Sequence, residues 1–375
     1  MIDGHIHYAE SLEAERLQYI IEAYGLSGVA LQCIPKGGKI PVEEDAFSFK
    51  RQSSVPVYIF GGLDRRIFSL SPGRMAEALP GEIDRLMTMG CDGIKMLEGK
   101  PNVRKEYPVP DFDDEIWEEY WDVLEKRQIP VYMHVNDPEE FWDESKVSEY
   151  ARKAGWFYDE TYVNNQEQYR QMQEVLKRHP RLRILFPHFF FLSKDLGRLA
   201  AMLDQYPNVH TDVTPGIELY FNLSDQEKEA KAFFAKYQNR ICFGTDIGAR
   251  SLIYEEPIPL SIEESRSRLE LTTRFLEEKG DYILYPDGYY FTEGKERLMH
   301  GLGLSAEILK KIYHDKFLKI YFVIYLPQKQ GEEAFLCFFP LLFREYSNKI
   351  IKCTIDNGSQ LTYNTNVNDN QNQYR

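Results

Sequence analysis

Two histidines near the start of the chain, His5 and His7, are separated by a single residue. Side chains on a strand repeat every two residues, so both imidazoles would share a face and could reach one ion, with metal–nitrogen distances of about 2.0–2.1 Å. Asp3 precedes them in the same register and could support the site from below. Taken alone, the pair is as compatible with hydrogen-bonded or exposed histidines, so its meaning depends on the rest of the chain.

Three more ionisable residues lie at the ends of apolar runs: His134 in VYMHV, His188 in LFPHF and Asp246 in CFGTD. In a parallel barrel the carboxyl ends of all strands meet on one face, so residues more than a hundred positions apart would converge there. Burial of an unpaired ionisable group is costly, and this placement therefore favours a functional site. Three histidines and one aspartate around an open position are typical of a catalytic metal site that keeps a place for water.

Eight short apolar runs would position these side chains, and most are followed by an amphipathic stretch. The first stretch has the apolar spacing of one helix face, at Leu17, Ile20, Ile21 and Tyr24, and Gly25 suits the end of that helix. Eight such units predict an α/β protein with the (β/α)8 architecture of a TIM barrel. The runs are MIDGHIH, SGVALQC, VPVYIFGGLD, CDGIKML, IPVYMHV, RILFPHFF, NVHTDVT and RICFGTDI.

The barrel is expected to span residues 1–321, with a closing helix whose N-cap is Ser305. Residues 322–375 form an atypical C-terminal extension, and its last stretch, NTNVNDNQNQYR, has a composition typical of disorder. Residues 137–165 make a long connection after the fifth run, which is either a roof over the barrel mouth or a surface excursion with a small helix. Residues 280–301 have no clear place in the repeat.

The net charge of -14, without a basic tract, argues against nucleic acid as a partner. The five cysteines include no CxxC pair, which disfavours a disulfide framework or a cysteine-based zinc site and fits a reducing compartment. The start of the chain does not resemble a signal peptide, and no apolar stretch reaches the roughly 20 residues that cross a bilayer. We expect a cytoplasmic protein that acts on a small molecule, with no membrane partner and with homo-oligomerisation left open.

The motifs DGHIH, VYMHV, LFPHF and FGTD, in this order, resemble those of the amidohydrolase superfamily. The likeness is to its amidohydrolase-related (amidohydrolase 2) branch of metal-dependent TIM-barrel hydrolases and decarboxylases, and it covers about residues 1–321. The resemblance implies that a single divalent ion is held by four residues, His5, His7, His134 and Asp246. It also implies that His188 stays off the metal and holds the attacking water or polarises the substrate.

Binuclear relatives bind a second ion through the sixth-strand histidine and a bridging carboxylated lysine or a glutamate on the fourth strand. Lys95, in GIKML, could be such a bridge, a partner for a substrate carboxylate, or a lysine without a special role, and Glu98 lies beyond the strand. The chain departs from the family at Lys316, where an asparagine is common, and after Tyr321, where no counterpart is recognised. Both departures concern the C-terminal closure of the barrel rather than the metal site.

Arg65, in GGLDRR, and Arg250, in GTDIGAR, are candidate anion-binding residues at the barrel mouth, because a guanidinium holds a carboxylate through two hydrogen bonds. An ordinary loop ion pair explains each of them equally well. Tyr220 is expected in the core, and His300 and His314 are expected in helices.

The predicted reaction is hydrolysis of an amide, ester or lactone in a small substrate that could carry a carboxylate. A metal ion would activate water, Asp246 would carry its proton to the leaving group, and His188 would stabilise the oxyanion. Zinc (Zn2+) is the default ion for a nitrogen-rich site, with manganese, iron and cobalt as alternatives. Two other functions remain open: a metal-dependent decarboxylase (lyase) acting on an aromatic or enoic acid, and a metal-binding barrel without catalysis.

Overall fold

A computed structural model describes residues 1–8, 14–34, 42–216, 218–249, 260–285, 295–321, 351–355 and 361–365. The chain divides into two units, Met1–Phe322 and Val323–Arg375. In the second unit, the described residues form one antiparallel hairpin of β11 (Ile351–Ile355) and β12 (Leu361–Thr365). The tail that we expected to be disordered starts in β12, with Asn364 and Thr365, and its other residues lie outside the described part of the chain.

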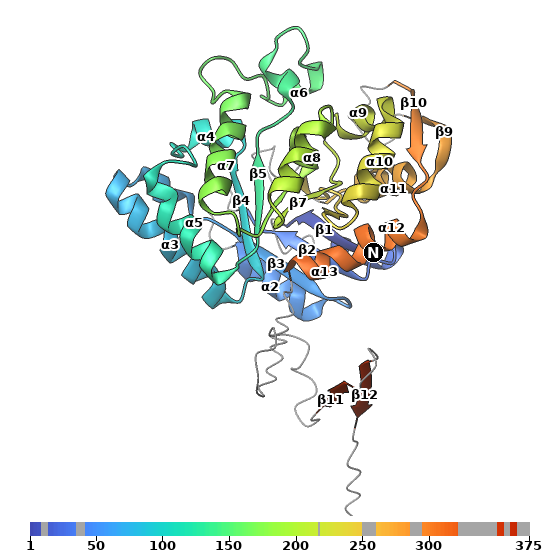
Figure 1. The fold of residues 1–375 in the computed structure, drawn as a ribbon, viewed down its shortest axis with the longest axis horizontal. Coiled ribbons are helices and arrows are strands. Elements are labelled where there is room, and N and C mark those ends of the chain that lie inside the picture. The colour runs from blue at the N-terminus through green and yellow to red at the C-terminus, as the bar shows by residue number, and fades with distance from the viewer. Residues whose placement is uncertain are drawn as a thin grey trace, which may run out of the picture. The chain divides into compact units, whose positions relative to one another are not determined.

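The first unit is built around a sheet of eight strands in the order β1 to β8, each parallel to the next (Figure 1). The sheet nearly closes into a barrel, because the N–H of Gly4 donates to the carbonyl of Phe243 at 3.0 Å and that of His7 to Ile247 at 2.8 Å. This confirms the predicted (β/α)8 barrel. The strands are Ile2–His7, Gly28–Gln32, Val57–Gly62, Gly93–Gly99, Val131–Val135, Ile184–Phe186, Val209–Asp212 and Ile241–Cys242.

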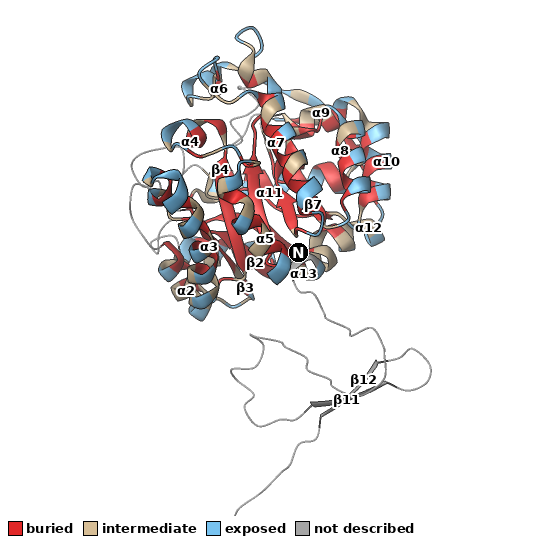
Figure 2. Cartoon of the chain, turned by 60° about the vertical axis from the view of Figure 1, so that its left-hand side comes forward, coloured by how far each residue is buried: buried red, intermediate tan, exposed pale blue. Residues whose placement is uncertain are grey.

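Helices alternate with the strands and cover the outside of the barrel, with their exposed faces outward (Figure 2). Among the described residues, no helix is both long and apolar enough to span a membrane. The helices α1 to α13 are, in order, Ala14–Ala23, Val42–Gln52, Pro72–Met89, Pro101–Glu106, Glu118–Arg127, Glu149–Lys153, Asn165–Arg178, Leu196–Gln205, Leu219–Asp225, Glu227–Tyr237, Ile262–Glu277, Ala306–Lys310 and Lys316–Tyr321.

Two apolar clusters hold the barrel together. Inside it, Phe317 of α13 packs against side chains from six strands, namely Ile2, Ala30, Phe60, Tyr132, Leu185 and Cys242. Side chains from six strands can meet in this way only within the ring of the sheet. The alternate strand residues, such as Val29, Ile59 and Val131, belong to the larger cluster between sheet and helices.

Within the stretch 280–301, the described residues belong to two antiparallel paired strands, β9 (Lys279–Leu284) and β10 (Arg297–Leu302), and residues 286–294 lie outside the described part of the chain. The expectation that His300 lies in a helix is therefore wrong, since it pairs with Asp281 across the hairpin. The hairpin could not be predicted because its two strands are short and far apart in the sequence, and neither shows a clear alternation of apolar and polar residues. Tyr220 is buried in the core as predicted.

The long connection after β5 forms a small module with its own apolar cluster of Phe141, Val147, Ala151 and Tyr158. Figure 1 shows its helix α6 projecting beyond the end of β5. The module is fastened to the barrel at Asp137, which accepts a hydrogen bond from Tyr158 at 2.5 Å and from Lys100 at 2.6 Å. The segment thus combines features of both alternatives, because it contains a small helix and also lies at the barrel mouth.

Candidate metal centre

Both histidines of β1 face the barrel interior because this strand is irregular. Its pairing with β2 shifts in register between Asp3 and Ile6. Regular alternation would put His5 on the opposite face from Ile2, which packs inside the barrel. The register shift reverses this alternation, so that His5 points into the barrel, as Ile2 does. Asp3 holds this segment, since its carboxylate accepts hydrogen bonds from the N–H of His5 at 3.1 Å and from the hydroxyl of Thr245 at 2.5 Å.

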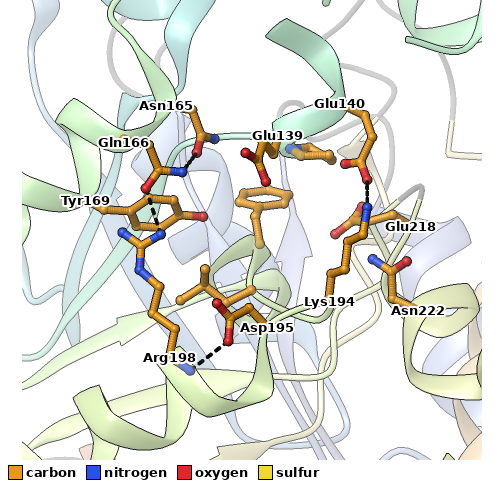
Figure 3. Close-up of a pocket in the computed structure, with 13 residues that line it drawn as sticks. Glu139, Glu140, Asn165, Gln166, Tyr169, Lys194, Asp195, Arg198, Glu218 and Asn222 are labelled. Carbon is orange, nitrogen blue, oxygen red and sulfur yellow. Dashed lines mark hydrogen bonds and ion pairs between the residues drawn. The ribbon is translucent and has the colours of Figure 1, made fainter. Parts of the chain in front are cut away.

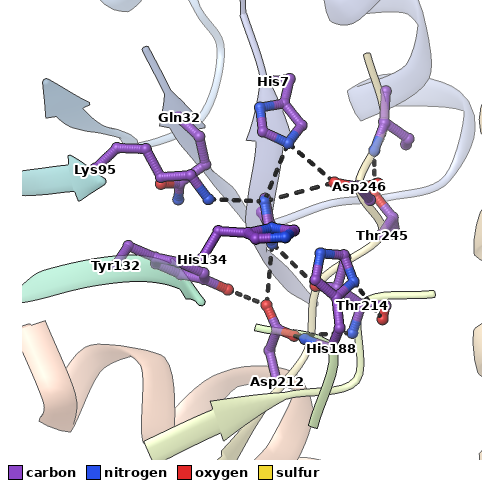
Figure 4. A network of polar contacts seen from close by, with 12 residues as sticks. His7, Gln32, Lys95, Tyr132, His134, His188, Asp212, Thr214, Thr245 and Asp246 are labelled. Carbon is purple, nitrogen blue, oxygen red and sulfur yellow. Dashed lines mark hydrogen bonds and ion pairs between the residues drawn. The ribbon is translucent and has the colours of Figure 1, made fainter. Parts of the chain in front are cut away.

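The side chains of His5, His7 and Asp246 converge on one point, and Figure 4 shows His7 and Asp246 pointing toward one another there. The Nε2 atoms of His5 and His7 lie 3.2 Å apart. Oδ1 of Asp246 lies 2.9 Å from Nε2 of His7 and 3.5 Å from Nε2 of His5. His7 and Asp246 are 239 positions apart along the chain. The barrel closure between β1 and the segment after β8 brings them together.

The backbone that carries Asp246 is held close to β1. The N–H of Asp246 donates to the carbonyl of His5 at 2.9 Å, and its φ of 61° is in the left-handed region. Gly248 has a φ of 84°, and a Cβ atom there would lie 2.2 Å from the carbonyl oxygen of His7. Only glycine allows this approach. Arg268 of α11 lies 3.5 Å from the other carboxylate oxygen of Asp246.

His188 joins the cluster from the end of β6. One ligand atom from each of His5, His188 and Asp246 lies within 4.8 Å of the others. Nδ1 of His188 is 3.2 Å from the carbonyl oxygen of Thr214, an atom that can only accept, so Nδ1 carries the hydrogen. The Nε2 atom of a neutral His188 is therefore a lone-pair acceptor. It can hold a water or an ion, but it cannot donate to an oxyanion as the sequence led us to expect.

His134 lies beside His188, with 5.3 Å between the ring centroids. Its Nε2 is 2.9 Å from the carbonyl oxygen of Asn136, so Nε2 carries the hydrogen and Nδ1 the lone pair. His5, His7 and Asp246 contact one another, and these contacts do not include His134. As a ligand it would have to use Nδ1, with the Nε2–H bond to Asn136 fixing the ring.

Asp212, at the end of β7, supports the cluster from behind. Its Oδ2 accepts hydrogen bonds from Nδ1 of His5 at 3.1 Å and from the hydroxyl of Tyr132. Its Oδ1 accepts from the N–H groups of His188 at 2.8 Å and Thr214 at 3.1 Å. The hydrogen of His5 is thus fixed on Nδ1, and Nε2 keeps its lone pair. Asp212 is not among the site residues predicted from the sequence, although it lies at a strand end, as His134 does.

Lys95 of β4 is buried beside the same cluster. Its Nζ lies 3.2 Å from Nε2 of His5 and 4.8 Å from the ring centroid of Tyr132. Burial lowers the pKa of Lys95 to about 8, although the nearby carboxylates of Asp246, Asp212 and Glu98 oppose this. The lysine therefore stays largely protonated at neutral pH and is a buried hydrogen-bond donor at the centre.

The two candidate arginines differ. Arg65 forms an ion pair with Glu98, with 3.0 Å between Nε and Oε1, and its guanidinium lies 5.2 Å from the ring centroid of Tyr107. This contact fits the ion-pair alternative better than a free anion-binding role. The expectation that Glu98 lies beyond the fourth strand is wrong, since β4 extends to Gly99. Arg250 lies outside the described residues.

The family model of the amidohydrolases matches residues 60–320 of this chain. The chain belongs to the amidohydrolase family. Members of this family are enzymes that use divalent metal ions and act on small molecules. The matched range contains His134, His188 and Asp246 but begins after His5 and His7, so the first-strand ligands rest on the sequence motif and the geometry given above. No curated protein sequence matches this amidohydrolase.

Solved structures of TIM-barrel enzymes also resemble it. An uncharacterised TIM-barrel protein from Bordetella bronchiseptica has 11% identity and a TM-score of 0.49, covering 85% of this chain and 97% of its own. A dihydroxybenzoic acid decarboxylase from Polaromonas with bound manganese has 14% identity and a TM-score of 0.48, covering 85% and 96%. A lactonase from Listeria monocytogenes has 8% identity and a TM-score of 0.46, covering 85% and 93%.

The protonation states of the amidohydrolase centre suit metal binding. Burial lowers the pKa of His7, lowers that of His5 well below its usual value, and lowers that of His188 to about 4, so these imidazoles are neutral at pH 7. Burial alone would raise the pKa of Asp246. The hydrogen bond that His7 donates, together with the electrostatic effect of the His7 and His5 rings, outweighs burial and holds that pKa well below the usual range.

The distances also fit an ion. Four ligands at about 2.0–2.1 Å in a tetrahedron stand about 3.3 Å from one another. The separations among His5 Nε2, His7 Nε2 and Asp246 Oδ1 are 2.9, 3.2 and 3.5 Å, which bracket that value. Nδ1 of His7 is buried without a hydrogen-bond partner, so the ring is positioned by its Nε2 contacts alone. The residues present therefore fit a divalent cation.

Proposed function

We propose that this amidohydrolase is a metal-dependent hydrolase that cleaves an amide, ester or lactone bond in a small substrate. The observation that carries the proposal is the convergence of two imidazole Nε2 atoms and one carboxylate oxygen within 3.5 Å of one another. Imidazole nitrogens and a carboxylate oxygen gathered this closely are the donor set that a divalent cation prefers. His5, His7 and Asp246 would hold the ion, with His134 through Nδ1 or His188 through Nε2 as the next ligand.

A bound divalent ion polarises a carbonyl group and lowers the pKa of water from 15.7 toward about 7. Asp246, an ionised carboxylate, accepts the proton of the attacking water and returns it to the leaving nitrogen or oxygen. His188 accepts a hydrogen bond at Nε2 and so orients the water. Lys95 donates to the carbonyl oxygen as negative charge develops, which is the role that we first assigned to His188.

The proposal extends to the metal, the catalytic unit and the cellular compartment. The nitrogen-rich ligand set favours zinc, with manganese, iron or cobalt as alternatives. Residues 1–321 would be the catalytic unit and residues 322–375 an extension, in line with the division of the chain after Phe322. The cysteine pattern favours a cytoplasmic protein.

Decarboxylation is the second candidate, and the buried Lys95 is the observation that favours it. A cation 3.2 Å from a metal-binding histidine could hold the carboxylate of an aromatic or enoic acid next to the ion. In that reaction the bond between the carboxylate and the substrate carbon breaks, CO2 leaves, and the carbon takes up a proton. The same site residues would then serve a lyase.

Two measurements test the proposal. Elemental analysis should find about one divalent ion per chain, and two ions would bring in Lys95 as a carboxylated bridge. The metal-loaded protein is then given a panel of amides, esters, lactones and hydroxybenzoate-type acids, with product analysis. Hydrolysis without CO2 supports the hydrolase, and CO2 release supports the lyase. A protein that holds metal but converts none of them would be a non-catalytic barrel, and a protein without metal affinity would overturn the site.

A further inference from the structure

A second polar site lies beside the metal centre. A pocket of about 510 Å³, including its open mouth, is lined by residues that follow three neighbouring strands (Figure 3). Glu139 and Glu140 follow β5, Phe191 and Lys194 follow β6, and Glu218 follows β7. The pocket thus belongs to the same face of the barrel as the metal ligands, which is where barrel enzymes bind their substrates.

Phe191 connects the two sites. Its side chain lines the pocket, and its ring centroid lies 5.0 Å from that of His188 and 5.2 Å from that of His134. The pocket and the histidines of the metal centre therefore lie on opposite sides of this one ring.

Glu218 is the unusual member of the pocket. Both of its carboxyl oxygens are buried and have no hydrogen-bond partner, and no other carboxyl group among the described residues has this property. Buried polar groups are nearly always paired, because an unpaired carboxylate costs several times the worth of an ordinary hydrogen bond. An exception in a pocket indicates a group whose partner arrives with the ligand.

The cations of the pocket are engaged elsewhere. Lys194 forms an ion pair with Glu140, at 3.1 Å. Arg198 donates from Nη1 to Gln166 at 2.8 Å, and its guanidinium lies 4.3 Å from the ring centroid of Tyr169. Figure 3 shows Glu218 on the same side of the pocket as the pair of Lys194 and Glu140. With four acidic and two basic side chains in the lining, the uncompensated charge is negative.

We infer that this pocket binds a cationic amine of the substrate, with the carboxylate of Glu218 as its partner. The inference rests on the proposed function, because it places the amine on the same molecule whose amide, ester or lactone bond lies at the metal centre. An ammonium group brings three hydrogen-bond donors and one positive charge, which supplies both things that Glu218 lacks. The substrate class is then an amino-bearing amide, ester or lactone.

The protonation of Glu218 agrees with this. Burial raises the pKa of Glu218 to about 8; its own backbone N–H works against this rise, and the charges of Glu140 and Asp137 add to it. Without a cation the group is mostly neutral at pH 7. Binding of an ammonium ion favours the carboxylate, so the amine should enter as the proton of Glu218 leaves.

Binding is tested without any reaction. n-Butylammonium chloride is titrated into the metal-loaded protein by calorimetry at pH 7, in buffers that differ in ionisation enthalpy, with n-butanol as the uncharged probe. Wild-type protein should bind the ammonium probe with release of close to one proton, and bind n-butanol at least about tenfold more weakly. Glu218→Gln should weaken ammonium binding about 10- to 100-fold and abolish proton release, because hydrogen bonds to charged groups are worth about that much.

Glu229→Gln is the matched control. It removes an exposed carboxylate of α10, outside the pocket, and should leave binding unchanged. Should Glu218→Gln fail to fold, Lys194→Met gives a second test. It removes the pocket cation that pairs with Glu140 and so leaves the pocket more negative, and it should bind n-butylammonium at least as tightly as wild type. Equal binding of n-butylammonium by wild type and Glu218→Gln, weaker binding by Lys194→Met, or no binding at all would overturn the inference.

Turnover distinguishes this inference from the function on which it rests. The p-nitroanilides of 6-aminohexanoic and hexanoic acid form a pair that differ in the terminal amine. Both proposals are supported if wild type prefers the amine-bearing anilide and Glu218→Gln loses this preference, mainly through a higher KM. Glu218-dependent binding without hydrolysis keeps the amine subsite and counts against the hydrolase. Hydrolysis with no amine preference and no Glu218-dependent binding keeps the hydrolase and overturns the subsite.

Discussion

Replacement of Asp212 by asparagine tests how the metal centre is organised. Asp212 makes no central contact itself but accepts from Nδ1 of His5 through one oxygen and from the N–H groups of His188 and Thr214 through the other. An amide nitrogen in place of either oxygen would face donors. The side chain of Asp212→Asn should place its oxygen toward the two backbone N–H groups, because they cannot change, and its NH2 toward His5.

That orientation forces His5 to respond. Facing an NH2 group, its Nδ1 must become the acceptor, so the hydrogen moves to Nε2. Nε2 then loses the lone pair that points at His7 and Asp246. Loss of such a supporting contact weakens metal affinity about 10- to 100-fold, or about 1.4–2.7 kcal/mol.

Competition with a chromophoric chelator measures this affinity directly. Asp122→Asn is a suitable control, since Asp122 is a half-exposed residue of α5 paired only with Lys126, and its metal affinity should equal that of wild type. Circular dichroism should confirm that both variants are folded. An Asp212→Asn protein that binds metal as tightly as wild type would refute the reasoning about the tautomer of His5.

Further predictions concern single residues. His7→Ala should lose its metal by elemental analysis while circular dichroism shows a folded barrel, and unchanged metal content would count against the ligand assignment. Gly248→Ala should lower Tm by at least the equivalent of about 1–2 kcal/mol, because its Cβ would lie 2.2 Å from the carbonyl of His7 at a φ of 84°; an unaltered Tm would contradict the close approach. Lys95→Met should retain metal but lose kcat about 100-fold or more, as expected on removal of an oxyanion donor, and a loss confined to KM would point to a binding role. Glu218→Gln should stabilise the apoprotein increasingly as pH rises from about 4.5 to 8, since a carboxyl whose pKa rises to about 8 on folding binds more protons folded than unfolded and so costs stability in that window; urea unfolding at pH 5 and 8 tests the sign.

The barrel could be predicted from the sequence because its strands are short apolar runs that alternate with stretches of helical periodicity. It also placed His5, His7 and Asp246 at strand ends, and the structure brings their ligand atoms within 3.5 Å of one another. Strand polarity determines which end of the barrel a residue occupies, and that information is contained in the order of residues along the chain. The prediction of convergence therefore needed no knowledge of distances.

What the sequence could not give was the detail that depends on contacts. The register shift at Asp3 has no signal in the residues themselves, and regular alternation would have given the wrong face for His5 relative to Ile2. The hydrogen on His188 is fixed by a carbonyl 26 residues away, which changes its role from donor to acceptor. Glu218 is recognisable only because its buried carboxyl oxygens have no hydrogen-bond partner, which no sequence pattern records.

The closure between β1 and the segment after β8 has a consequence for how the enzyme matures. The backbone of His7 is bonded to Ile247, and that of Asp246 to His5, so the last seam of the barrel joins residues about 240 positions apart. Loops of this length close late and slowly, because their ends have the most entropy to lose. A growing polypeptide on the ribosome therefore holds its first two ligands long before their carboxylate partner has been made. Tight capture of the ion would then occur only after synthesis has passed Asp246, and metal retention would report that the whole ring has formed.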